Sequence, residues 1–149
     1  MKPITHILVA TDFSDSADEA LTYALTLADQ VGATARLVHV FDDPGAIGLY
    51  SDGYVPMPAE TRAEILAEIR RQLTARAAAT GRKDLPSEVL TGAPARTIVD
   101  AARQHQCDLI VMGTHGRHGM AHLLLGSVAE RVVRTAACPV LVVRRPSAP

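Results

Sequence analysis

The chain reads LIVMGTHG at residues 109–116, and this stretch decides the class of fold. Its first four residues are all apolar, so the segment suits burial on both faces, as in a middle strand of a parallel sheet. Glycines follow at positions 113 and 116, and glycine lets a chain turn sharply or approach another group closely. We therefore expect a buried parallel strand that leads into a loop at the carboxyl edge of the sheet, where open α/β sheets bind their ligands.

On both sides of this strand, short β-branched runs alternate with longer segments of helical period. Strands are expected at residues 4–10, 34–41, 87–91, 109–112 and 140–143. Helices are expected to start near Ser16, Ala59, Pro94 and Ser127. Ser16 with Glu19 and Ser127 with Glu130 have the spacing of capping boxes, and proline favours a first helical turn. This order predicts one α/β domain over residues 1–149, a three-layer sandwich in which helices cover both faces of a five-stranded parallel sheet.

Composition and charge limit the classes of function. Of the 149 residues, 48% are hydrophobic and 3% aromatic, and 15 basic against 16 acidic side chains give a formal net charge of −1. Such a chain has no surplus of cations to neutralise a row of phosphates and few rings to stack on bases, so we expect no nucleic-acid partner. Residues 1–75 hold 5 basic and 11 acidic residues, and residues 76–149 hold 10 and 5. This imbalance favours an anion site in the second part.

The chain has no apolar run of the ~18 residues that a membrane span needs, and its amino-terminal residues do not resemble a signal peptide. We therefore expect a cytoplasmic protein that does not act at membranes. Cys107 and Cys138 match no metal-binding or redox spacing. We expect two reduced, mostly buried thiols, and a disulfide or redox switch is the alternative interpretation.

The glycines after the fourth expected strand have a spacing that differs from the common phosphate-binding motifs. No G-x-G-x-x-G follows the first strand and no P-loop motif occurs, which disfavours a nicotinamide dehydrogenase and a P-loop ATPase. Instead Gly113-x-x-Gly116 is followed by nine residues and then by Gly126-Ser127 at a helix start. Glycines there can adopt positive φ close to a ligand, and the helix start offers amides and a hydroxyl to a polyphosphate. The alternative is a plain strand exit at Gly113 and a simple helix cap at Ser127.

This glycine pattern, together with other segments, resembles the universal stress protein family in its ATP-binding branch. The supporting segments are ILVATDFS at 7–14, LVHV at 37–40, LLGSVAE at 124–130 and CPVLVV at 138–143. The resemblance covers nearly the whole chain. It implies the strand order 3-2-1-4-5 in a Rossmann-like fold of the adenine nucleotide alpha hydrolase type.

The resemblance also implies a role for individual residues. Asp12 would lie with its carboxylate near the ribose, Val40 would offer backbone hydrogen bonds to adenine, and Gly113 would pack on the ribose. Gly116, Gly126, Ser127 and Val128 would hold the phosphates. The complete set expected to bind the cofactor is Ala10, Thr11, Asp12, Val40, Met112, Gly113, Gly116, Arg117, Gly126, Ser127 and Val128. The ligand would be ATP, or AMP or ADP in its place, with Mg²⁺ or Mn²⁺ bridging the phosphates; no protein metal site and no catalytic residue is expected.

Several polar residues allow a second interpretation. Asp12 has the alternative of capping the helix that follows it. The glycine loop also contains three histidines: His115, His118 and His122. We expect their side chains to be solvated. The alternative is that one of them stabilises a γ-phosphate together with Arg117. His39 is expected to be a hydrogen-bonded core histidine. The basic residues near the end of the chain are expected to be solvated rather than to bind a polyanion: Arg131, Arg134, Arg144 and Arg145.

The strand at residues 140–143 would be an edge strand, and it is too apolar to leave exposed. The resemblance implies that it pairs across a two-fold axis in a homodimer. We expect an ATP-binding regulator of the stress response. The first alternative is a slow ATPase or phosphotransfer enzyme, for which the sequence offers no positioned general base. The second alternative is a dimeric interaction module with a vestigial nucleotide site. The intact glycine spacing argues against it.

Overall fold

The computed structural model describes residues 1–43, 55–114 and 125–145. Its strands are β1 (His6–Ala10), β2 (Thr34–Phe41), β3 (Ser87–Thr91), β4 (Leu109–Gly113) and β5 (Val140–Val143). Its helices are α1 (Asp15–Val31), α2 (Ala59–Ala79), α3 (Pro94–Gln104) and α4 (Ser127–Thr135). All paired strands are parallel and follow the order β3-β2-β1-β4-β5. The predicted fold class and strand order are confirmed.

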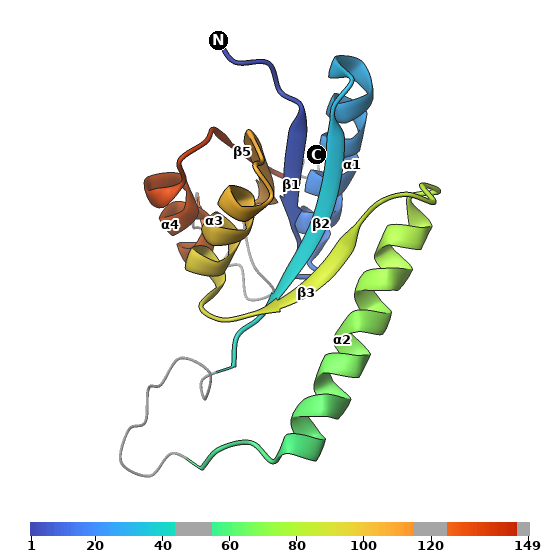
Figure 1. Cartoon of the computed structure of the whole chain (residues 1–149), viewed down its shortest axis with the longest axis vertical. Helices are drawn as coiled ribbons and strands as arrows, with labels where there is room; N and C mark the ends of the chain where they lie inside the picture. The colour runs from blue at the N-terminus through green and yellow to red at the C-terminus, as the bar shows by residue number, and fades with distance from the viewer. Residues whose placement is uncertain (44–54, 115–124, 146–149) are drawn as a thin grey trace.

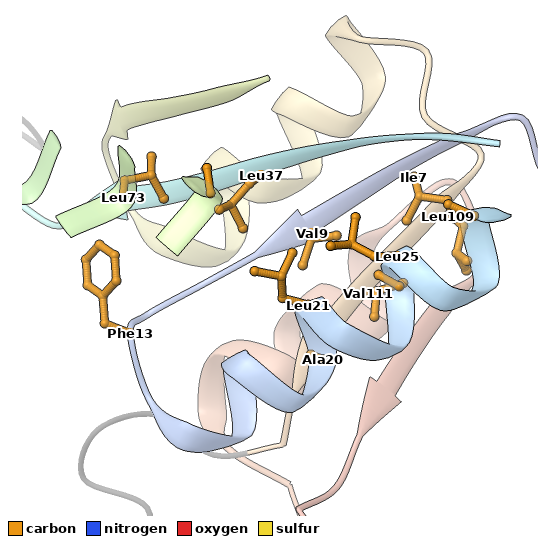
Figure 2. Close-up of a cluster of buried hydrophobic side chains, with 13 residues drawn as sticks. Ile7, Val9, Phe13, Ala20, Leu21, Leu25, Leu37, Leu73, Leu109 and Val111 are labelled. Atoms are coloured by element: carbon orange, nitrogen blue, oxygen red, sulfur yellow. The ribbon is translucent and has the colours of Figure 1, made fainter. Parts of the chain in front are cut away.

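The sheet lies between two layers of helices, with α1 and α2 on one face and α3 and α4 on the other (Figure 1). Successive residues of β1 alternate between the layers: Ile7 and Val9 pack under α1, and Leu8 and Ala10 face α3 and α4. Figure 2 shows Leu21 and Leu25 of α1 lying over this strand. Since each fully buried side chain of this size stabilises the fold by roughly 1.5–3 kcal/mol, the middle strands anchor the protein.

The turn from β1 into α1 differs from the expectation. The N-cap is Ser14, whose hydroxyl accepts the N–H of Ala17 at 3.2 Å. Ser16 is buried inside the first helical turn, so the expected capping box of Ser16 with Glu19 is wrong. The physical reason is a tight turn just upstream, in which an Asp12 carboxylate oxygen accepts the N–H of Ser14 at 3.0 Å and brings the helix start forward.

Helix α4 starts at Ser127 as expected, but Ser127 is not its cap. Gly126 is the N-cap, no side chain caps the helix, and the N–H of Glu130 donates to the Gly126 carbonyl at 2.9 Å. The expected capping box of Ser127 with Glu130 is therefore wrong. The Ser127 hydroxyl is not used for capping because the backbone of the preceding glycine already satisfies the Glu130 amide.

Two further sequence features can be located in the described part of the chain. None of its helices combines the length and the apolar character needed to cross a bilayer. Cys107 and Cys138 are free and partly buried, and both pack against the side chains between the sheet and the layer of α3 and α4. Burial raises the pKa of the Cys107 thiol to about 11, against a smaller lowering by the Arg36 cation.

Candidate functional site

A cavity of about 210 Å³ opens at the carboxyl edge of the sheet, where β1, β2 and β4 end and α3 and α4 begin. This is the point at which the chain order reverses between β1 and β4, the usual ligand site of open α/β sheets. Of the residues expected from the sequence, those that line it are Ala10, Thr11, Asp12, Val40, Met112, Gly113, Gly126, Ser127 and Val128. Gly116 and Arg117 lie outside the described residues, as do His115, His118 and His122.

Gly113 is required by a close approach of two elements. A Cβ atom at this position would lie 2.5 Å from Ser16 Oγ and 2.8 Å from the Ser16 carbonyl carbon. Atoms do not approach so closely, so any side chain at position 113 would force the start of α1 away from β4. Among the described residues, the glycines with positive φ are Gly32, Gly81 and Gly92. The expectation of positive φ at Gly113 is therefore wrong, because Gly113 is the last residue of β4 and keeps an extended backbone. Glycine is needed at this position only because it has no side chain.

The start of α4 presents donors to the cavity. The amides of the first helical residues, Ser127 and Val128, have no acceptor within the helix, and the positive end of the helix dipole favours an anion there. The amide of Gly126 is different, because it donates to the carbonyl of Thr114 at 2.6 Å. In this structure the Gly126 amide is thus engaged inside the protein, contrary to its expected use as a phosphate donor.

The opposite side of the cavity is formed by β2. The carbonyl of Val38 accepts the N–H of Thr11 at 2.9 Å. This backbone hydrogen bond lies at the end of the β1–β2 pairing, where the chain leaves β1 for the turn into α1. Residues two apart along a strand direct their backbone groups to the same side. The N–H and C=O of Val40 therefore point past the end of β1, at the cavity. The apolar surroundings come from Met112 and from Ile98 of α3.

The turn that carries Asp12 has a strained backbone. Phe13 has φ of +66°, a conformation that costs a non-glycine residue roughly 1–2 kcal/mol. The hydroxyl of Thr11 accepts the N–H of Phe13 at 3.1 Å, and Asp12 accepts from Ser14 as described above. The alternative interpretation of Asp12 as the cap of α1 is wrong, because Ser14 is the N-cap and Asp12 stabilises the turn before it. A carboxylate has acceptor capacity for about four hydrogen bonds, so this role and a ligand contact are compatible.

His39 was expected to be a hydrogen-bonded structural histidine, and it also lines the cavity. Its Nδ1 lies 2.7 Å from the carbonyl oxygen of Thr11, and because a carbonyl only accepts, Nδ1 carries a proton. The ring stacks on Phe13 with centroids 4.4 Å apart and planes at 27°. Further lining residues that the sequence did not single out include Thr114, which directly follows Gly113.

No group of three or more metal-ligating side chains occurs within the described ranges 1–43, 55–114 and 125–145. The titratable side chains lining the described part of the cavity are Asp12 and His39. Both hold the turn between β1 and α1 through hydrogen bonds. The described part of the site is thus built mainly from backbone donors and apolar walls.

A doubly wound parallel sheet with a cavity at its reversal point defines an α/β protein with a Rossmann-like fold. Within that class the chain belongs to the universal stress protein family, whose sequence model matches residues 3–144. It is 39% identical over 140 residues to the universal stress protein MJ0531 of Methanocaldococcus jannaschii, covering 94% of this chain and 82% of that protein.

Two solved structures extend the comparison. The structure of MJ0577, also from Methanocaldococcus jannaschii, superposes with a TM-score of 0.80 at 26% identity and covers 99% of this chain and 100% of that one. A universal stress protein in complex with cAMP superposes with a TM-score of 0.64 at 28% identity, covering 95% and 98%. The fold and the family are therefore shared, and one of these relatives holds an adenine nucleotide.

Proposed function

We propose that this protein binds ATP in the cavity at the carboxyl edge of the sheet and acts as a nucleotide-dependent regulator of the stress response. The observation that carries the proposal is the convergence of Asp12, Val40, Ser127 and Val128 on one cavity from the turn after β1, from β2 and from the start of α4. These residues offer groups suited to each part of a nucleotide. The adenine nucleotide bound by the cAMP-complexed relative supports the same chemistry. ADP and AMP are the alternative ligands.

The adenosine end would lie against β2. Adjacent N–H and C=O groups of Val40 match the ring N1 acceptor and the exocyclic amine donor of adenine. Ile98 and Met112 provide apolar contact for the base in place of aromatic stacking. The Asp12 carboxylate suits the ribose hydroxyls, which are hydrogen-bond donors, and charge-assisted bonds of this type are the stronger ones.

The phosphates would lie at the start of α4. Amides of Ser127 and Val128 together with the Ser127 hydroxyl form a small anion site at the positive end of the helix dipole. Gly116 and Arg117 would complete it. Mg²⁺ or Mn²⁺ would be held mainly by phosphate oxygens and water, because Mg²⁺ keeps several waters and the described residues offer no cluster of ligands.

A direct test is calorimetric titration of ATP into the wild-type protein and Gly126→Val. The Gly126 backbone, with φ −68° and ψ 159°, accommodates a β-branched residue, while the added side chain would obstruct the phosphates. We expect a loss of ATP affinity of about tenfold or more, equivalent to at least ~1.4 kcal/mol. Ala75→Val, which places the same valine side chain at an exposed position on α2, is the control. Equal affinities of the wild type and Gly126→Val would contradict the site.

An assay of ATP hydrolysis on the same protein distinguishes a regulator from the alternative of a slow ATPase or phosphotransfer enzyme. Incubation with ATP and magnesium should leave ATP largely unhydrolysed, since Asp12 and His39 are both engaged in the turn rather than placed as a general base. Repeated turnover to ADP that disappears in Gly126→Val would favour the enzyme.

We further infer that the chain acts as one domain, in the cytoplasm, as a homodimer. The strand β5 lies at one edge of the sheet, and its four residues are apolar and only half-buried. Pairing of two such edges would remove both from water. Light scattering at micromolar concentration should give twice the mass of the chain; a monomer would contradict the dimer while leaving the nucleotide site untouched.

A further inference from the structure

The two carbonyl groups that flank Asp12 are each held by a side chain from another element. The carbonyl of Thr11 accepts Nδ1–H of His39 in β2 at 2.7 Å. The carbonyl of Phe13 accepts Nη2–H of Arg76 in α2 at 3.1 Å. The backbone on both sides of Asp12 is thus held by residues distant in sequence.

Arg76 makes further contacts that hold it in place. Its Nη1 donates to a carboxylate oxygen of Asp18 in α1, and its guanidinium carbon lies 5.5 Å from the centre of the Phe13 ring. The Arg76 side chain is only one-third exposed, at 33%. A planar guanidinium can make these contacts together because its donors point in fixed and different directions. Arg76 therefore joins α2, α1 and the turn after β1.

The turn needs such support because it is not a relaxed conformation. Phe13 has positive φ, and residues of this kind persist only where surrounding contacts over-determine the backbone. Without the guanidinium, the carbonyl of Phe13 would lose its partner from α2. The turn could then relax toward negative φ at Phe13, and the direction of the Asp12 side chain would change with it.

We infer that Arg76, which does not line the cavity, positions the Asp12 carboxylate for the ribose of a bound nucleotide and so couples nucleotide binding to the docking of α2. This inference rests on the proposed function. The coupling is reciprocal by thermodynamic linkage. A nucleotide that stabilises the observed turn therefore also stabilises the observed packing of α2 against it. Arg76 is a positioning residue, and its effect should be specific to the ribose.

The test compares ATP with 2′,3′-dideoxy-ATP, which lacks both ribose hydroxyls, by calorimetry on full-length protein. The wild type should prefer ATP. In Arg76→Met, which keeps much of the aliphatic stem, this preference should fall by roughly fivefold to tenfold, within the usual range of coupling between sites. Binding of the dideoxy nucleotide should change little. Arg71→Met is the matched control, since Arg71 is 76% exposed on the same helix and pairs with Glu68.

Two additional variants separate positioning from a general loss of structure. Arg76→Lys retains a cation for Asp18 but cannot reproduce the planar set of donors, so a partial loss of ribose preference is expected. In Asp12→Asn, adding Arg76→Met should cause little further loss of preference, because the group being positioned is already changed. If Arg76→Met fails to fold, these comparisons are made with Arg76→Lys.

The outcomes are distinguishable. A wild type that binds no ATP overturns the proposed function and this inference with it. A wild type that binds ATP, alongside an Arg76→Met variant with unchanged ribose preference, overturns the inference alone. Equal losses for ATP and the dideoxy nucleotide would also overturn it, because they would indicate a structural effect without specific positioning of Asp12.

Discussion

The backbone N–H of Gly126 donates to the carbonyl oxygen of Thr114 at 2.6 Å. Thr114 directly follows β4 and is only 3% exposed, so this bond fixes the first turn of α4 against the end of a central strand. It sets where the amides of Ser127 and Val128 lie at the cavity. The geometry of the candidate phosphate site therefore depends on a bond that no ligand makes.

Replacing Gly126 by proline should break this bond with little backbone strain at the residue itself. Proline requires φ near −65°, and Gly126 has φ of −68°. The buried Thr114 carbonyl would lose this hydrogen bond, and such a loss costs roughly 1–3 kcal/mol in the free energy of unfolding. Urea denaturation provides the measurement. Gly126→Ala, which keeps the N–H, is the control, and equal stabilities of the two variants would argue against the importance of the bond.

Gly113→Ala should destabilise the protein through a steric clash. The new methyl group would meet both the Ser16 hydroxyl and the Ser16 backbone, and overpacking of this kind costs typically ~1–3 kcal/mol. Combining it with Ser16→Ala should recover only part of the loss, because the backbone contact at 2.8 Å remains. Thermal unfolding of the single and double variants checks this. Complete recovery in the double variant would show that the hydroxyl alone is responsible.

Asp108 should make stability depend on pH in the acid range. Burial raises the pKa of its carboxyl, but hydrogen bonds from the Thr5 side chain and from the backbone of His6 and Thr5 outweigh this, and the net pKa is lowered. A pKa lower in the folded state contributes stability above the unfolded value of about 4, which is lost as pH falls through the folded value.

The measurement for Asp108 is the free energy of unfolding of the wild type and Asp108→Asn between pH 7 and pH 2. At neutral pH the variant should be less stable by roughly 1.5–3 kcal/mol, the range for hydrogen bonds to charged groups. The difference should shrink below about pH 4. A difference that stays constant down to pH 2 would contradict the assignment.

Cys107 should react slowly with alkylating reagents in the folded protein. Its pKa of about 11 leaves very little thiolate at neutral pH, and the thiolate is the reacting species. At pH 8 we expect labelling by iodoacetamide about 100-fold slower than in urea, where the thiol returns to its ordinary pKa near 8.5. Mass spectrometry of the peptide containing Cys107 gives both rates. Similar rates with and without urea would contradict this expectation.

Local pattern predicted most of the fold. The expected strands at residues 34–41, 87–91 and 140–143 have the bounds observed, and Pro94 opens α3 as expected. These features depend on alternation, β-branching and the fixed φ of proline, which are properties of neighbouring residues. The error at the first capping box also has a local cause. Ser14 and Ser16 are both good cap residues, and only the Asp12 turn decides between them.

Contacts distant in sequence account for the rest. The requirement for glycine at position 113 comes from Ser16, and the support of the Asp12 turn comes from His39 and Arg76. None of these pairs shares a local motif, so a single sequence does not reveal them. The family resemblance supplied the candidate nucleotide residues, and their gathering around one cavity is a geometric result. Their binding of nucleotide stays a prediction.

The contact of Ser16 with Gly113 has a consequence for how the chain is made. On a ribosome, β1 and α1 emerge long before β4, yet the surface on which the first turn of α1 rests belongs to β4. The β1–β4 pairing at the middle of the sheet likewise joins segments that are far apart in sequence. The core of the nascent amino-terminal half therefore stays incomplete until residue 113 has been synthesised. Pairing between such distant segments is intrinsically slow, which prolongs this incomplete state.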